Sequence, residues 1–259
     1  YDDQPVIAGD LKVEGAVTAL LKYALLPNLV QTTEGVPAII HGGPFANIAQ
    51  GTNSIIGTDL ALRLADYVVT EAGFGFDLGA EKFFDIVAPY GNFNPRIVVL
   101  VATVRALKYH AGIPREDLNE ANPHAAVLGM ANLRKHYENI DKFNIPCIVA
   151  LNQFKSDTTE EIQAVIKTAE NEGINISPVD IFARGGEGGI ELAEKIVELI
   201  SKAKGGYRPL YDWNLPVEDK IFKVASEIYG AVSIDYQPLA RRNLDMIKRI
   251  GFEKLPVCI

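Results

Sequence analysis

The stretch RIVVLVATV, residues 96–104, decides the fold of this chain of 259 residues. Residues 97–101 of this stretch are all apolar, so a strand formed by them has no polar face for water. Strands that are apolar on both faces are typical of parallel sheets covered by helices on each side. Residues 145–151 form a second run of this kind, with a helical pattern between the two.

The same alternation of patterns extends along most of the chain. Strands are expected at 36–41, 67–70, 96–104, 145–151 and 174–182, and helices at 54–65, 80–87, 123–143, from Thr158 onward and at 190–203. This order predicts an α/β fold, a mostly parallel, doubly wound sheet flanked by helices.

The chain is expected to divide near residues 204–209, which read as a linker. Residues 1–205 would form the α/β core. Two further helices, expected at 216–229 and 238–250, would make 206–259 the partial helical start of a next domain. The first residue is Tyr1 and the last ones, 255–259, look like a strand being entered, so we expect a fragment of a longer protein.

Composition excludes several classes of protein. A net charge of −8 argues against broad nucleic-acid binding, which needs a basic face. No apolar run approaches the roughly 20 residues that span a bilayer, and no partnership with a membrane is expected. The two cysteines and four histidines show no metal-ligand spacing, so no metal site is expected, and Cys147 should be a buried apolar residue. Few cysteines fit a reducing, cytoplasmic location.

Glycine and asparagine gather where the expected strands end, the usual ligand-binding edge of an open α/β sheet. The loops concerned are 41–47, 71–79, 103–105, 152–154 and 182–189. Several also hold a phenylalanine: Phe45, Phe74, Phe76, Phe154 and Phe182. Exposed rings at one edge favour a flat ligand, whereas for any single loop the glycines could equally serve tight turns.

Four polar residues of these loops are possible supporting groups: His41, Glu71, Asp77 and Arg105. A structural hydrogen-bonding role is as plausible for His41 as a catalytic one. Glu81 and Asp85 belong to an acidic stretch that is expected to be mostly solvated or to start a helix. Neither the phosphate-binding pattern GxxxxGK[ST] nor a GxGxxG fingerprint occurs in the sequence.

Five motifs, in this order, resemble formate–tetrahydrofolate ligase, the 10-formyltetrahydrofolate synthetase family. They are HGGPFANIA (41–49), ADYVVTEAGFG (65–75), DLGAEKF (77–83), VATVRALK (101–108) and GGEGG (185–189). The resemblance runs from Pro5 to Ile259. It implies an incomplete P-loop NTPase-like core and a reaction in which formate, ATP and tetrahydrofolate give 10-formyltetrahydrofolate, ADP and phosphate through formyl phosphate.

The resemblance also implies ligands and partners. ATP (with Mg) and tetrahydrofolate would be substrates, no tightly bound cofactor is expected, and the full-length protein would be a homo-oligomer in the cytoplasm. The pterin ring would stack on Phe74, next to Gly75, with Phe154 and Phe182 lining the same pocket. The nucleotide side would be formed by Gly43, Pro44, Phe45, Ala46 and Asn47.

This sequence departs from the family pattern at several of these places. Phe182 stands where the family commonly has Trp, Lys155 where it has Pro, and Phe76 where it has Ala, which would add bulk beside Phe74. The family's P-loop and its Arg–Glu pair near formyl phosphate do not occur in this chain, so no catalytic residue can be named.

Three hypotheses remain open. The first is the ligase, with this chain inactive alone because it lacks the P-loop. The second is a folate- or nucleotide-binding module without catalysis. The third is another carboxylate-activating enzyme with a different acceptor.

Overall fold

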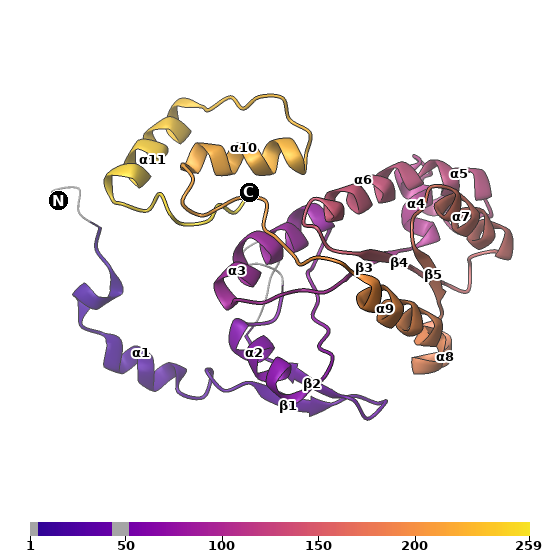
Figure 1. Ribbon diagram of the computed structural model, residues 1–259, viewed down its shortest axis with the longest axis horizontal. Helices are drawn as coiled ribbons and strands as arrows, with labels where there is room; N and C mark the ends of the chain where they lie inside the picture. Colours follow the sequence, from indigo (N-terminus) through magenta and orange to yellow (C-terminus); the bar gives the residue numbers. More distant parts are fainter. Residues whose placement is uncertain (1–4, 43–51) are drawn as a thin grey trace. The chain divides into compact units, whose positions relative to one another are not determined.

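The computed structural model describes residues 5–42 and 52–259, which form two compact units (Figure 1). The sheet unit is Asn94–Arg208. The split unit combines Tyr1–Phe93 with Pro209–Ile259. The expected division of the whole chain at residues 205 and 206 stays a prediction.

The sheet unit contains a parallel three-stranded sheet in the order β3-β4-β5, which confirms the predicted α/β class. The strands are β3 (Val98–Ala102), β4 (Cys147–Asn152) and β5 (Ile176–Val179). Every residue of β4 from 147 to 151 is buried, as the apolar run predicted, and so is Cys147. The central strand therefore has a helix layer on each face.

Figure 1 shows the two helix layers on opposite faces of this sheet. One layer holds α4 (Val104–His110), α5 (Pro123–Leu128), α6 (Met130–Asp141) and α7 (Thr159–Asn171). Their apolar side chains enclose Val149 and Leu151. On the other face α9 (Ile190–Lys202) packs on Ile148 and Ala150. The unit also contains the short helices η4 (Arg115–Asp117), α8 (Ile181–Arg184) and η5 (Gly185–Gly189).

The structure of this unit differs from the expectation at three places: a helix, a strand and a loop. The helix expected at 123–143 is broken at Gly129, where a Cβ atom would lie 1.8 Å from the carbonyl oxygen of Leu107. The strand expected at 174–182 ends at Val179, because Asp180 caps α8. Residues 103–105 were expected to be a loop, but Thr103 caps α4 at once.

The split unit begins with two short helices, η1 (Ala8–Leu11) and α1 (Glu14–Leu21). The strand expected at 36–41 is confirmed as β2 (Pro37–Ile40), but it pairs antiparallel with β1 (Asn28–Gln31), which the sequence did not reveal. The next helix, α2 (Ile55–Leu64), starts where predicted.

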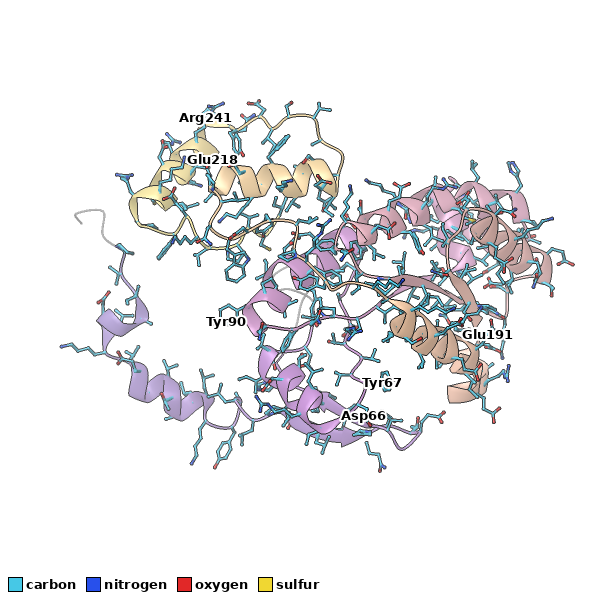
Figure 2. All side chains as sticks on the ribbon, viewed as in Figure 1. Asp66, Tyr67, Tyr90, Glu191, Glu218 and Arg241 are labelled. Carbon is cyan, nitrogen blue, oxygen red and sulfur yellow. The ribbon has the colours of Figure 1, made fainter. Side chains whose placement is uncertain are left out.

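The other regular elements that the structure describes in the split unit are helices. The expected helix at 80–87 begins earlier and ends later, as η2 (Phe76–Ala80), η3 (Phe83–Val87) and α3 (Ala88–Gly91), and its first two parts are wound as π-helix. The two helices predicted near the C-terminus are α10 (Val217–Glu227) and α11 (Pro238–Arg249), which carry Glu218 and Arg241 in Figure 2.

The strand expected at 67–70 was a wrong prediction. These residues form no β-ladder with any other part of the chain that the structure describes. Tyr67, labelled in Figure 2, and Val69 are exposed, Val69 by 94%. An apolar run becomes a strand only where a neighbour offers backbone donors and acceptors.

Over residues 5–42 and 52–259, no helix is both long and apolar enough to cross a membrane.

Candidate functional site

Three of the predicted site residues lie at the carboxyl edge of the parallel sheet. Arg105 is in the first turn of α4, directly after β3, and its side chain is exposed. Phe154 follows the end of β4, and Phe182 follows the end of β5 in α8. Because β4 and β5 pair in register up to Asn152 and Val179, the two rings start from neighbouring strand ends.

Phe154 is held by a tight turn. Its backbone N–H donates to Asp157 Oδ2 at 2.9 Å, and the Asp157 N–H donates to the Phe154 carbonyl at 2.9 Å. Burial raises the pKa of the Asp157 carboxyl. The turn leaves the Phe154 ring exposed, and Lys155 beside it is also exposed.

Phe182 is 90% exposed, so its ring contributes little to the packing of the unit. The Gly-rich run that follows has a packing role. A Cβ atom on Gly188 would lie 2.2 Å from the carbonyl oxygen of Asp180, and the Gly188 carbonyl accepts the Asp180 N–H at 3.2 Å. Gly185 has φ 59, a value that favours glycine. The tight-turn interpretation therefore explains these glycines without a ligand.

A buried ion pair connects the helices behind this edge. Lys108 Nζ donates to Glu161 Oε1 at 2.7 Å and to the carbonyl of Glu120 at 2.9 Å. The two Glu161 oxygens also accept the backbone N–H groups of Asn122 and Thr158, each at 2.9 Å. Burial alone would raise the pKa of Glu161, but the hydrogen bonds from Asn122, Lys108 and Thr158 outweigh it and lower that pKa.

Sequence reasoning missed this network. The spacing of Thr158 and Glu161 is that of a capping box, and the structure contains one there. That local signal could have identified Glu161 as a helix-capping residue. Nothing local identifies Lys108 as its partner, because the two residues are 53 positions apart.

In the split unit, Phe74 occupies an exposed loop directly before η2. It has φ 63, in the left-handed region, and its side chain is 74% exposed. Gly75 is the residue that precedes the first turn of η2. The loop lies against that helix, since a Cβ atom on Gly79 would lie 1.9 Å from the Gly73 carbonyl oxygen.

Phe76 was expected as an exposed ring at the ligand-binding edge, and this prediction was wrong. It is 4% exposed, and its ring centroid lies 6.0 Å from that of Phe84. The bulk that it adds relative to Ala is therefore placed in the core of the unit.

His41 is used structurally. It is buried, and its Nε2 lies 2.8 Å from the Ala24 carbonyl while its Nδ1 lies 2.6 Å from Ser54 Oγ. Nε2 must donate to the carbonyl, so Nδ1 of a neutral ring accepts from Ser54, whose oxygen in turn accepts the Gly57 N–H. Both ring nitrogens are thus engaged, which favours the structural role.

The other predicted residues of the split unit are more dispersed. Glu71 is exposed, and the Asp77 carbonyl accepts a hydrogen bond from Tyr229 at 3.2 Å. Gly43, Pro44, Phe45, Ala46 and Asn47 lie outside the described residues. Within the residues that are described, no group of three His, Cys, Asp or Glu side chains is arranged to hold a metal ion.

Glu81 and Asp85 contradict the expectation of solvated charges. Their exposures are 1% and 0%, and they lie one helical turn apart beside the buried rings of Phe83 and Phe84. The apolar neighbours of both residues in the sequence are compatible with burial, but they do not identify the partner that makes the burial of a carboxyl group possible.

Comparison with known proteins agrees with the motifs. The family model described as formate–tetrahydrofolate ligase matches residues 1–259. The formate–tetrahydrofolate ligase of Syntrophus aciditrophicus (strain SB) is 81% identical over all 259 residues, which correspond to 46% of that relative. The chain thus spans about half the length of this curated relative. It belongs to the formate–tetrahydrofolate ligase family.

Proposed function

We propose that this chain provides folate-side and nucleotide-side walls of an enzyme that joins formate to tetrahydrofolate at the expense of ATP. In the first step a formate oxygen attacks the γ-phosphorus of ATP, which forms formyl phosphate and releases ADP. In the second step N10 of tetrahydrofolate attacks the formyl carbon and releases phosphate. The observation that carries the proposal is 81% identity to a protein named for this activity.

The carboxyl edge of the sheet unit supports the folate side of this proposal. Phe154 and Phe182 are exposed rings that follow the neighbouring parallel strands β4 and β5, and the positively charged Arg105 follows β3. Rings in such a position suit the flat pterin, since exposed aromatic faces gain free energy by stacking. We assign the same role to Phe74 with Gly75, and we assign Gly43 to Asn47 to the nucleotide side.

For the bound substrates we propose ATP with Mg²⁺ and tetrahydrofolate, without a tightly held cofactor. The chemistry that Mg²⁺ supplies when bound with ATP is neutralisation of the charge on the phosphates. We further propose a cytoplasmic homo-oligomer for the full-length protein, with no nucleic-acid partner.

Stacking can be tested on the isolated chain by titration with tetrahydrofolate. Phe154→Ala and Phe182→Ala should each weaken binding by about 1–3 kcal/mol, by analogy with bases stacked on aromatic rings. Tyr109→Ala is the matched control, because Tyr109 is a ring about as exposed as Phe154 and lies at the far end of α4. Unchanged affinity in both Phe variants would refute the stacking role.

Activity separates the ligase from a binding module without catalysis. Because the sequence lacks the P-loop pattern, the isolated chain should form no formyltetrahydrofolate from ATP and formate. Adding the remaining part of the ligase as a second polypeptide should restore activity if the chain is a working part of that enzyme. Turnover by the isolated chain would contradict the first expectation.

Thermal protection of the chain by another acceptor, and not by tetrahydrofolate, would favour a different carboxylate-activating enzyme.

A further inference from the structure

Two buried carboxyl groups of the split unit have no role in the proposed reaction. Glu81 and Asp85 lie one turn apart in the helical segment 76–91, and neither is accessible to water. Glu81 Oε1 and Asp85 Oδ2 meet no hydrogen-bond donor among the described residues. A buried acceptor without a donor is costly, and two buried carboxylates also repel each other. A proton held between the two groups removes both costs.

The surroundings assign this proton mainly to Glu81. Asp85 Oδ1 accepts the Leu210 N–H at 2.7 Å, which stabilises the charged form of Asp85. Burial, the charge of Asp85 and a hydrogen bond with Asp85 raise the pKa of Glu81 to about 9. Burial raises the pKa of Asp85 to about 7, against the effect of the hydrogen bonds that it receives. These surroundings favour a Glu81 carboxylic acid that donates to an Asp85 carboxylate.

The same turn of helix holds a distant part of the chain. Besides the bond from Leu210, the Asp85 carbonyl accepts the indole N–H of Trp213 at 2.9 Å. The Trp213 ring stacks on Tyr90 of α3 with a centroid distance of 6.4 Å, and Tyr90 is labelled in Figure 2. The segment 209–213 is therefore attached at the position that binds the proton.

We propose that Glu81 and Asp85 share one proton and act as a proton-dependent latch that fixes residues 209–213 to the helical segment 76–91. Loss of the proton at alkaline pH places two negative charges side by side in a buried site. The contact then loosens, because hydration of the two charges requires the packing around them, which includes the segment 209–213, to open. The latch does not depend on the proposed function.

Other titratable groups near the pair do not account for such a transition. The Lys82 ammonium lies beside Glu81 and lowers its pKa, so it favours the charged form. Tyr211 and Tyr229 face the pair, but burial raises the pKa of Tyr211, and burial raises that of Tyr229 to about 12. Cys258, whose charge acts on Tyr211, is exposed and can be replaced by Ser in every variant.

Trp213 is the only tryptophan of the chain, so its fluorescence reports the latch directly. A pH titration of the whole chain should give a one-proton transition on the alkaline side of neutral pH, accompanied by a red shift of the emission. Glu81→Gln should remove this transition, because the amide donates to Asp85 at every pH. Asp245→Asn, which changes an exposed carboxylate of the same unit, should titrate like the parent chain.

Infrared spectroscopy keeps the proposal testable if Glu81→Gln does not fold. The parent chain should show the band of a buried protonated carboxylic acid at pH 7, and this band should disappear together with the fluorescence change. Absence of the band at pH 7, constant Trp213 emission from pH 6 to 10, or an unchanged transition in folded Glu81→Gln would each overturn the latch.

Discussion

Replacing Lys108 by Met removes one partner of the buried ion pair in the sheet unit. The side chains of Lys108 and Glu161 are 1% and 0% exposed, so the change leaves a carboxylate without its counter-ion and out of reach of water. Breaking a buried pair in this way costs about 3–5 kcal/mol. Because Glu161 keeps the N–H groups of Asn122 and Thr158, we expect the lower end of that range, about 3 kcal/mol.

Urea denaturation at pH 7, followed by circular dichroism, measures the effect as a change in the free energy of unfolding. Lys202→Met is the matched control, since it breaks an exposed pair with Glu198 on α9 and should leave the free energy of unfolding almost unchanged. The double variant with Lys108→Met and Glu161→Met should lose less than the sum of the two single losses. A loss below about 1 kcal/mol in Lys108→Met would refute the reasoning.

The acid dependence of stability provides a second check on the same pair. The pKa of Glu161 is lowered in the folded chain, so its stabilising effect is present above the unfolded pKa and is lost as the pH falls through the folded value. In Lys108→Met the carboxylate has one donor fewer, and its folded pKa must rise. The variant should therefore lose the Glu161 contribution at a higher pH than the parent chain.

Three further predictions follow from local geometry. Thr158→Ala removes the hydroxyl that accepts the Glu161 N–H and should cost about 0.5–2 kcal/mol in thermal unfolding. Gly79→Ala should prevent the loop before η2 from closing, since the new Cβ would meet the Gly73 carbonyl oxygen at 1.9 Å, and limited proteolysis should then cut this loop faster. With a thiol reagent at neutral pH, Cys258 should react at once, whereas Cys147 should react only as the chain unfolds, because burial raises the pKa of its thiol.

The parts of the fold that local signals determine could be predicted from the sequence. Residues 97–101 and 145–151 are apolar without interruption, and both runs lie in strands of the parallel sheet. Ser54 and Thr158 begin helices at the expected positions because their side chains accept backbone N–H groups of the first turn.

The parts of the fold that depend on contacts with residues distant in the sequence could not be predicted. Residues 67–70 have the composition of a strand, but a strand requires a partner, and their sequence does not name one. Glu81 and Asp85 are charged residue types, which are almost never fully buried unless paired, so exposure was the natural expectation. The break at Gly129 depends on a backbone contact with Leu107 that has no local signature.

The candidate site shows the same limit. Phe74, Phe154 and Phe182 were expected as exposed rings in loops or at strand ends, and each is exposed. Glycine, asparagine and aromatic residues at strand ends are a local pattern, so this much could be foreseen. The structural use of His41 could not, because its partners Ala24 and Ser54 come from other segments.

The left-handed backbone conformation at Phe74 has a consequence for which residue type is most stable at this position. Left-handed φ costs a residue with a Cβ atom roughly 1–2 kcal/mol, and glycine avoids that cost. Phe74→Gly should therefore raise the melting temperature while it removes the ring, and Phe74→Ala should remove the ring without this gain. A lower melting temperature for Phe74→Gly than for Phe74→Ala would contradict the argument. Stability alone would favour glycine at this position, and the folate-stacking role that we propose for Phe74 would account for an aromatic ring there.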